Sequence, residues 1–157
     1  MHKLSLLLFC FIFLPLFSFG QLSVGGGASY DTAFERGGLN VQGMYEINKR
    51  LRPSFNMVYY ISPAGFISTS LSFNTNLHFL ILNKEKINVY GLGGLNITRF
   101  RLKDSFQKVI TTDLGLNIGG GIDFKLSKNL SGIGEVKYDF EDVINRWIIS
   151  AGVMYRF

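Results

Sequence analysis

The last eleven residues of the chain, 147–157, alternate between two kinds of side chain at every step. One set is apolar and ends on an aromatic residue at the chain terminus: Trp147, Ile149, Ala151, Val153, Tyr155 and Phe157. The other set is mixed: Ile148, Ser150, Gly152, Met154 and Arg156. A period of two indicates a β-strand with one apolar face. A strand of this kind at the end of a chain fits the closing strand of a barrel whose outer wall is solvated by lipid.

Seven more segments show the same alternation, and none shows the 3.6-residue period of a helix. With the last one, they are residues 22–30, 38–47, 51–61, 67–81, 87–100, 109–126, 130–140 and 147–157. Connections after the second, fourth and sixth segments are short, whereas the others are mostly longer. An even number of strands, each about long enough to cross a bilayer, is typical of a bacterial outer-membrane barrel. The sequence therefore predicts an all-β fold, an eight-stranded antiparallel up-and-down transmembrane β-barrel with both termini on the periplasmic side.

Residues 1–20 form a segment separate from the barrel. They combine a basic start, an apolar stretch and small residues directly before Gln21, which is the pattern of a cleaved secretory signal peptide. A retained membrane anchor is the alternative, but its apolar stretch is short for a bilayer span and Pro15 interrupts it. A lipid attachment site at Cys10 is disfavoured because a bulky residue precedes it. We predict a signal peptide over 1–20 and an outer-membrane barrel domain over 21–157.

The charge balance of the chain is basic. Without Lys3 the chain carries 15 basic and 11 acidic side chains. A basic balance can indicate a nucleic-acid partner, but export argues against one. We therefore expect no nucleic-acid partner, and we take anionic lipid headgroups as the counter-charge.

The two faces of the strands distinguish a lipid-facing barrel from a soluble one, which has the opposite arrangement. We predict that charges on the polar faces form a lumen network: Glu46, Arg52, Asp113, Asp123, Lys125, Glu135, Lys137, Asp139 and Arg156. Aromatic residues gather near both ends of the apolar faces. We place five at the short-turn end, Tyr45, Phe79, Phe124, Tyr155 and Phe157, and six at the loop end, Tyr30, Tyr59, Phe66, Phe100, Phe140 and Trp147. Two such bands are typical of the two interfaces of a bilayer, so we expect the apolar faces to meet lipid.

The C-terminal segment also carries the most specific motif of the chain, Ser150-x-Gly152-x-x-Tyr155-x-Phe157. With this motif, residues 21–157 resemble the small outer-membrane β-barrel family of Gram-negative bacteria, in particular its eight-stranded barrel-domain proteins from Bacteroidota. In that family the motif looks like the signal read by the barrel-assembly machinery. The resemblance implies a monomeric, porin-like protein of the outer membrane, exported by its signal peptide, with that machinery as a partner during biogenesis. It implies no particular activity.

No residues in the sequence form a convincing catalytic, cofactor or metal site. The glycine runs at 25–27, 91–94 and 119–121 lack the Lys-Ser/Thr pair and the following helix of a phosphate-binding loop. Glycines that allow sharp curvature or make room beside aromatic rings explain these runs better. We expect His78, the only histidine after the signal peptide, to be a hydrogen-bonded lumen residue near the short-turn end. A metal site would need a second His or a Cys, so we predict no metal.

Four cations crowd the longest predicted connection: Arg99, Arg101, Lys103 and Lys108. Because arginine and lysine pair with phosphate, we predict that these residues contact lipopolysaccharide at the outer surface. A solvated loop without a partner is the alternative.

These observations favour a non-enzymatic role in the cell envelope: structural, surface-interaction, or binding of a small ligand or lipid. Two alternatives stay open. A lipid-modifying enzyme of the deacylase or acyltransferase type would need a base at the outer rim, where the acidic residues have no histidine beside them. A narrow channel would need a path through the lumen, yet a barrel of eight strands is just wide enough for its side chains to fill.

Overall fold

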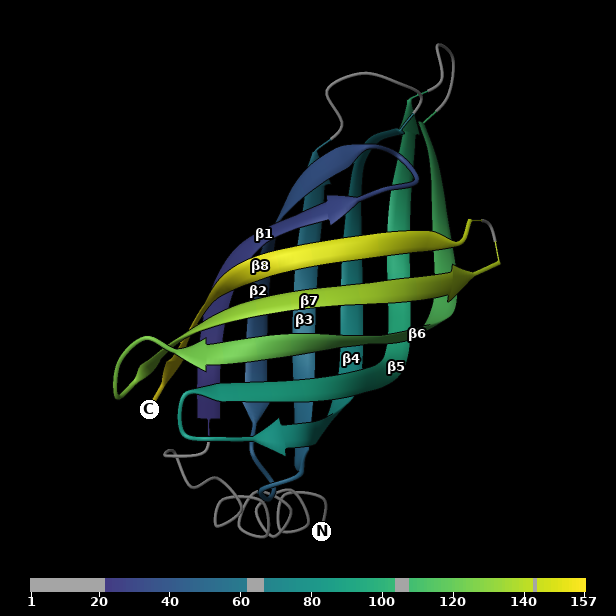
Figure 1. Cartoon of the computed structure of the whole chain (residues 1–157). Coiled ribbons are helices and arrows are strands. Elements are labelled where there is room, and N and C mark those ends of the chain that lie inside the picture. The colour runs from purple at the N-terminus through teal and green to yellow at the C-terminus, as the bar shows by residue number, and fades with distance from the viewer. Residues whose placement is uncertain (1–21, 62–66, 104–107, 143) are drawn as a thin grey trace, which may run out of the picture.

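The computed structural model describes residues 22–61, 67–103, 108–142 and 144–157, and in these ranges the chain forms eight strands. They are β1 (Leu22–Asp31), β2 (Arg36–Tyr45), β3 (Leu51–Ile61), β4 (Ile67–Asn83), β5 (Ile87–Lys103), β6 (Lys108–Lys125), β7 (Leu130–Glu141) and β8 (Arg146–Arg156). Each strand pairs antiparallel with its neighbours in the chain, and β8 pairs with β1, so the sheet closes into a barrel (Figure 1). The predicted eight-stranded antiparallel up-and-down barrel is confirmed. The described ranges contain no helix that is both long enough and apolar enough to cross a membrane.

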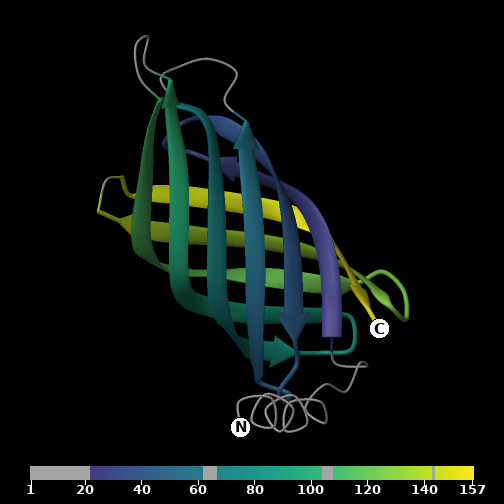
Figure 2. The ribbon, with the colours of Figure 1, turned by 180° about the vertical axis from the view of Figure 1, so that it is seen from behind.

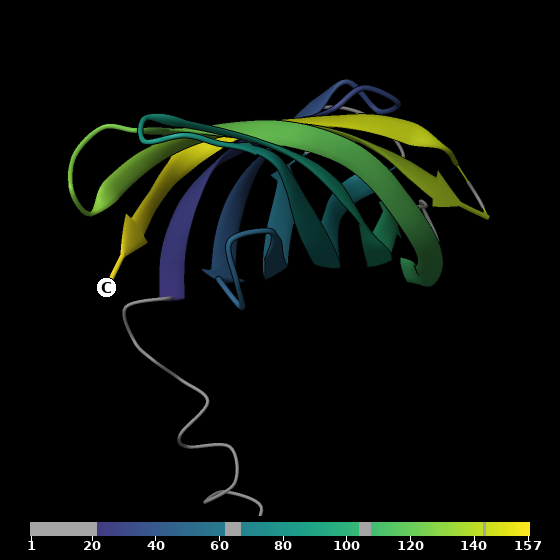
Figure 3. The same cartoon turned by 60° about the horizontal axis from the view of Figure 1, so that its bottom comes forward.

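The barrel closes where the two ends of the described chain meet. β8 lies beside β1 from Ser23↔Arg156 to Asp31↔Ile148, and the Phe157 amide donates a hydrogen bond to the Leu22 carbonyl at 3.1 Å. The start of β1 and the C-terminus therefore lie at one end of the barrel (Figure 1, Figure 3). We call this the terminal end, and it also carries the turns 46–50, 84–86 and 126–129. The opposite end is called the loop end.

The strands differ in length, and the longest ones extend the barrel at the loop end. β4, β5 and β6 have 17, 17 and 18 residues, while the other strands have 10 to 12. The β5–β6 pairing continues to Lys103↔Lys108, whereas the β6–β7 pairing stops at Gly115↔Glu141. One side of the barrel therefore rises above the other, as views from the two sides show (Figure 1, Figure 2).

This extension corrects the expected alternation of short turns with longer loops. The stretch 101–108, predicted as the longest connection, is strand up to Lys103 and again from Lys108. The connection predicted over 31–37 shrinks to the four residues between Asp31 and Arg36. The physical reason is that a hairpin satisfies its backbone hydrogen bonds whether or not its side chains alternate in hydrophobicity. A polar extension of a strand is therefore taken for a loop when strands are identified by their apolar periodicity alone.

The barrel has an apolar outer wall and a polar interior. On the outer wall, Leu39 and Ile81 are 66% and 70% exposed, whereas the interior residues Asn96 and Thr98 are 0% exposed. Along β5, Ile87, Leu95 and Ile97 face outward, whereas Tyr90, Leu92 and Phe100 are buried in the interior. A soluble ligand-binding barrel has apolar side chains inside and polar ones outside. The arrangement is that of a barrel surrounded by lipid.

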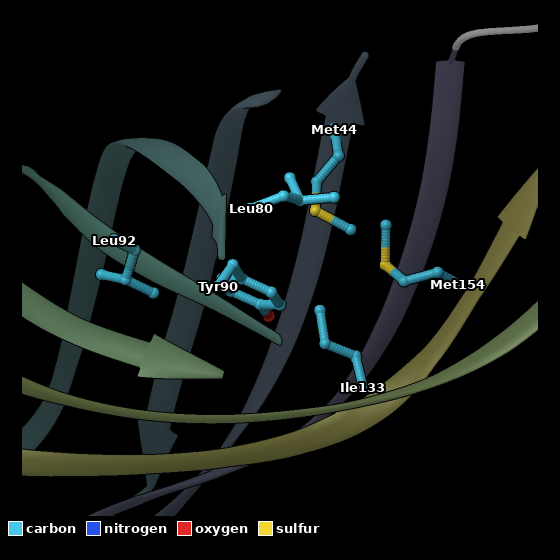
Figure 4. Close-up of a cluster of buried hydrophobic side chains, with 6 residues drawn as sticks. All are labelled: Met44, Leu80, Tyr90, Leu92, Ile133 and Met154. Carbon is cyan, nitrogen blue, oxygen red and sulfur yellow. The ribbon is translucent and has the colours of Figure 1, made fainter. Parts of the chain in front are cut away.

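A few apolar side chains do lie inside. The larger cluster lies toward the terminal end, where six side chains from five strands point into a common space (Figure 4): Met44, Leu80, Tyr90, Leu92, Ile133 and Met154. A second, smaller cluster contains Val58, Tyr60 and Ile148. Each cluster packs among polar interior residues, so the lumen is filled by mixed packing and has no single hydrophobic core.

The aromatic bands lie on the outer wall with one correction. At the terminal end, four of the expected rings are exposed: Phe79, Phe124, Tyr155 and Phe157. At the loop end, four more are exposed: Tyr30, Tyr59, Phe140 and Trp147. Phe100 was predicted in the loop-end band, but it is only 5% exposed and faces the interior. The reason is that Phe100 shares the inward alternation of Asn96 and Thr98 along β5. Phe66 lies outside the described residues.

Candidate functional site

Buried charges near the loop end of the interior form one ionic group, called here the loop-end cluster: Asp31, Arg36, Lys137, Asp139, Glu141 and Arg146. Guanidinium nitrogens of Arg146 lie 3.2 Å from the Asp31 carboxylate and 2.5 Å from that of Glu141. Asp31 also binds Arg36 at 2.9 Å, and Asp139 lies 3.2 Å from the Lys137 ammonium. All six side chains are at most 7% exposed. Because unpaired buried charges are costly, this mutual pairing is what makes the cluster tolerable.

Uncharged polar side chains connect this cluster to the far wall of the lumen. The Thr98 hydroxyl donates to Glu141 at 2.8 Å and accepts a hydrogen bond from Arg146 at 2.7 Å. The Asn96 amide donates to Glu141 at 3.0 Å. The Lys137 ammonium donates to Asn74 on β4 at 2.5 Å. Side chains from β7 and β8 are thereby tied to β4 and β5 across the barrel.

Aromatic rings surround Arg36. Its guanidinium carbon lies 4.6 Å from the ring centroid of Phe34, 4.9 Å from Tyr60 and 5.7 Å from Phe100. A cation over aromatic faces is attracted most strongly where water is excluded. Phe34 belongs to the short hairpin between β1 and β2, so this hairpin is held against the mouth of the lumen.

A second group, the central cluster, lies closer to the terminal end: Arg52, His78, Tyr90, Asp123 and Glu135. Arg52 donates two hydrogen bonds to Asp123, at 2.7 and 3.2 Å, in the bidentate geometry that suits guanidinium and carboxylate. The Arg52 guanidinium carbon lies 4.8 Å from the Tyr90 ring centroid. The Tyr90 hydroxyl donates to Glu135 at 2.7 Å. This chain of contacts crosses the lumen from β3 through β5 to β7.

His78 lies inside this cluster and is sealed from solvent. Its ring stacks on Tyr90 with centroids 4.5 Å apart, and its Nε2 atom lies 2.8 Å from the Ser54 hydroxyl oxygen and 3.7 Å from Glu135. A nucleophilic serine triad uses the two ring nitrogens for different partners, whereas here Ser54 and Glu135 approach the same nitrogen. The side chain is 0% exposed. A hydrogen-bonded lumen histidine, as expected from the sequence, describes this geometry.

The interior hollow between the two clusters and the β1–β8 seam has no room for water. The hollow bounded by Gln42, Ile133, Glu135 and Met154 has a volume of about 0 Å³ for a water-sized sphere. Over the part of the chain that the structure describes, no group of three or more His, Cys, Asp or Glu side chains is placed to hold a metal ion.

The nine residues predicted for the lumen network fall into three positions. Six are buried in the interior: Arg52, Asp113, Asp123, Glu135, Lys137 and Asp139. Glu46 and Arg156 pair with each other at the terminal mouth, where their side chains are 29% and 39% exposed. Lys125 is exposed at the end of β6 and does not join them. Its position in the alternation is inward, but Lys125 is the last residue of β6 at the terminal end, where its side chain is exposed.

Four members of the loop-end cluster were absent from the predicted network: Asp31, Arg36, Glu141 and Arg146. They lie in stretches that the sequence pattern assigned to connections. One signal could have found them, because Asp31 continues the alternation of Ser29, and Arg146 that of Ile148. Extending each predicted strand by two residues would have placed all four side chains on its inward face.

The predicted lipopolysaccharide contacts Arg99 and Arg101 lie on the outer wall of β5, and both are exposed. Together with Tyr59, Leu71 and Ile110 they line a hollow of about 220 Å³ near the loop end, called here the arginine groove. Two guanidinium groups therefore stand among apolar side chains on the lipid-facing side. The side chains of Lys103 and Lys108 lie outside the described part of the structure.

The residues of the predicted assembly signal lie on the closing strand. The hydroxyl oxygens of Ser150 and Ser29 lie 2.8 Å apart across the β1–β8 seam. Tyr155 and Phe157 face outward with ring centroids 5.3 Å apart. Recognition of this motif by the assembly machinery stays a prediction.

Comparison with known proteins places the chain among solved barrels. No protein-family profile matches it, and no curated protein matches it. The N-terminal β-barrel domain of Pseudomonas aeruginosa OprF is similar with a TM-score of 0.75 and 12% identity, over 87% of this chain and 96% of that one. Neisserial surface protein A has a TM-score of 0.69 and 16% identity, over 87% and 95%. Ail of Yersinia pestis has a TM-score of 0.63 and 19% identity, over 88% and 99%.

These likenesses show the fold, which is that of small eight-stranded outer-membrane barrels. At such identities they carry no information on activity. They support the broader resemblance noted in the sequence and give no support to the narrower one, to proteins of Bacteroidota.

Proposed function

We propose that this chain is a non-enzymatic outer-membrane β-barrel protein that acts at the loop end of its outer wall. The apolar outer wall and the two aromatic bands support a place in a bilayer. In bacterial barrels of this type both termini face the periplasm, so the terminal end would face the periplasm and the loop end the cell exterior. Export by the predicted signal peptide is part of the same proposal.

A structural or binding role is favoured over catalysis by the position of His78, the one histidine in the described part of the chain. A lipid-modifying enzyme of the outer leaflet needs its base at the loop end, within reach of a lipid. His78 lies in the central cluster instead, and its side chain has no exposed surface. A general base has to reach the proton that it abstracts.

The observation that carries the proposed role is the arginine groove. Charged residues on the lipid-facing wall of a barrel are costly at the bilayer midplane and are tolerated near the interfaces. Arg99 and Arg101 stand near the loop end, with the apolar side chains of Leu71 and Ile110 beside them. Guanidinium groups pair well with phosphate, so the groove suits a phosphorylated lipid of the outer leaflet. Lipopolysaccharide is the ligand that we propose.

Binding of purified lipopolysaccharide to the detergent-folded barrel tests this role. The variant R99Q/R101Q is expected to bind it at least fivefold more weakly than the unaltered chain. The variant K86Q/K128Q also removes two positive charges, but at the terminal end, and it should bind normally. Equal binding by all three proteins would contradict the proposal, as would altered lipid acyl chains in a deletion strain, which would favour an enzyme.

A sulfated glycan is the competing anionic ligand for the same arginines. Ail of Yersinia pestis was solved with the heparin analogue sucrose octasulfate, which therefore serves as the competitor in this measurement. If sucrose octasulfate binds through Arg99 and Arg101 while lipopolysaccharide does not, the groove is specific for a glycan. The proposal that lipopolysaccharide is the ligand would then be wrong.

A further inference from the structure

The terminal end carries a charge pattern that is the reverse of the pattern in the lumen. Within the described chain, the buried charges of the interior comprise six acids and four bases: Asp31, Asp113, Asp123, Glu135, Asp139 and Glu141, with Arg36, Arg52, Lys137 and Arg146. On the three turns and the adjoining end of β6, the exposed charges are six cations and one anion: Lys49, Arg50, Lys84, Lys86, Lys125 and Lys128, with Glu85. The acids of this barrel are concentrated inside, and this rim is left strongly positive.

Four of these cations border one hollow, called here the basic groove. It measures about 500 Å³ and is lined by Lys49, Arg50, Lys84 and Lys125, with Leu80, Ile81, Asn83 and Glu85 completing its walls. The cations come from the turn 46–50, the turn 84–86 and the end of β6. Separate segments therefore direct positive charge toward a common space.

Hydrogen bonds hold these segments in place. Asn48 Oδ1 accepts from the backbone amides of Arg50 and Leu51, at 2.8 and 2.9 Å, which is an Asx-type turn. The Asn83 side chain donates to the Lys49 carbonyl at 3.1 Å and joins the first two turns. The Lys125 amide donates to the Lys86 carbonyl at 2.9 Å and joins the second turn to β6. The backbone that carries the cations is thus ordered before any ligand arrives, which lowers the entropic cost of binding.

Aliphatic side chains border the same rim. Ile47, Ile81 and Leu126 are 57%, 70% and 54% exposed, and they adjoin the cationic turns in the chain. A surface with cations on one side and exposed aliphatic groups on the other matches an amphiphile with an anionic headgroup and acyl chains. A cell-wall polysaccharide would offer carboxylates to the cations but nothing to the aliphatic groups.

We propose that the basic groove binds the headgroup of an anionic glycerophospholipid in the membrane leaflet at the terminal end. The phosphodiester would lie among Lys49, Arg50, Lys84 and Lys125, and the acyl chains would run along the outer wall beside Ile81. This inference rests on the membrane placement in the proposed function, and it is independent of the arginine groove.

Native mass spectrometry of the barrel, residues 21–157 folded in detergent micelles, tests the inference. The probes are phosphatidylglycerol and phosphatidylethanolamine with identical acyl chains, so that only the headgroup differs. We expect preferential retention of phosphatidylglycerol, and a loss of roughly tenfold in the variant K49Q/R50Q/K84Q/K125Q, since each basic residue near an anionic headgroup adds to the attraction. The matched pair is K49Q/K84Q, which removes two charges of the groove and should weaken retention, and K86Q/K128Q, which removes two charges of the same rim outside the groove and should retain the lipid.

Three results would overturn the inference: no preference for phosphatidylglycerol, an equal loss in the two matched variants, or retention of soluble cell-wall fragments in place of lipid. Heat-modifiable gel migration checks that each variant is folded, and K49Q/K84Q replaces the fourfold variant if that one fails to fold. The membrane orientation is tested separately with Ser127→Cys. Labelling of this cysteine in intact cells would overturn the assignment to the periplasmic leaflet, whereas the micelle measurement decides the headgroup preference.

Discussion

At the scale of single residues, Arg146 holds together charges from distant parts of the chain. Its guanidinium contacts Asp31 on β1 and Glu141 on β7, and it also donates to Thr98 on β5. The planar, forked guanidinium can serve several acceptors at once, which a lysine ammonium on its flexible stem does less well. Arg146 therefore links the closing strand to three other strands through one buried group.

Replacing Arg146 with glutamine should strongly destabilise the barrel. Asp31 and Glu141 would lose a buried partner, and breaking a buried ion pair from one side costs about 3–5 kcal/mol. Denaturant-induced unfolding of the protein in lipid vesicles measures the loss. Arg156→Gln is the matched control, because its pair with Glu46 is half exposed and such pairs contribute at most about 1 kcal/mol. Similar losses in the two variants would contradict the role of Arg146.

At the scale of elements, inward-facing glycines let strands approach and bend. A Cβ atom added to Gly27 would overlap the backbone of Ala151 and Gly152 on β8, so no other residue fits there without movement. Gly121 similarly leaves room for the Tyr90 ring. The glycine runs therefore serve the close strand crossing and the packing of interior rings, in agreement with the interpretation from the sequence.

Gly27→Ala tests the close approach of β1 and β8, and Gly43→Ala is its control. Gly43 lies on the outward face of β2, and a Cβ atom added there meets nothing within 4 Å. We expect Gly27→Ala to lower the free energy of unfolding by about 1–3 kcal/mol, the usual cost of overpacking, with a smaller heat-modifiable fraction after refolding. Gly43→Ala should behave like the unaltered chain. Equal behaviour of the two variants would mean that β1 and β8 have room to separate.

At the scale of the whole molecule, the barrel combines an apolar wall with a lumen filled by ionic clusters. The loop-end cluster occupies the half of the interior at the loop end, and the central cluster crosses the other half through Arg52, Tyr90 and Glu135. A barrel of eight strands is just wide enough for its side chains to fill, so we expect these clusters to block a continuous aqueous path.

Planar-bilayer recordings should therefore show no steady conductance for the unaltered chain. A variant with Ala in place of Arg52, Tyr90 and Asp123 removes the crossing group and leaves neither partner of the Arg52–Asp123 pair behind. We expect this variant to admit water and to leak ions. Stepwise currents from the unaltered chain would show that the clusters open and would favour the narrow channel.

The strand number, the antiparallel topology and the orientation of most side chains were predictable from the sequence. Period-two alternation depends on local backbone geometry, and in a barrel that crosses a bilayer the apolar face has to meet lipid. The buried members of the predicted network, such as Asp123 and Glu135, followed from the same alternation. Phe100 was misplaced because the aromatic type of the residue was weighed above its position along β5.

The partners in the interior were not predictable in the same way. Asp31 and Arg146 are 115 residues apart in the chain, and only the register of β1 against β8 brings them together. Lys125 has the inward alternation of Asp123, yet it is exposed because it is the last residue of β6, at the terminal end. The register between strands decides which charges pair. The positions of the strand ends decide where the cations gather at the rim.

The sequence by itself thus determined the class of fold, because alternation is a local property and closure of the sheet is required to satisfy strand edges in lipid. Only the tertiary structure decided the contents of the lumen, the arginine groove and the basic groove. The physical reason is that these features are built from side chains on different strands, whose distances are set by register, strand length and curvature.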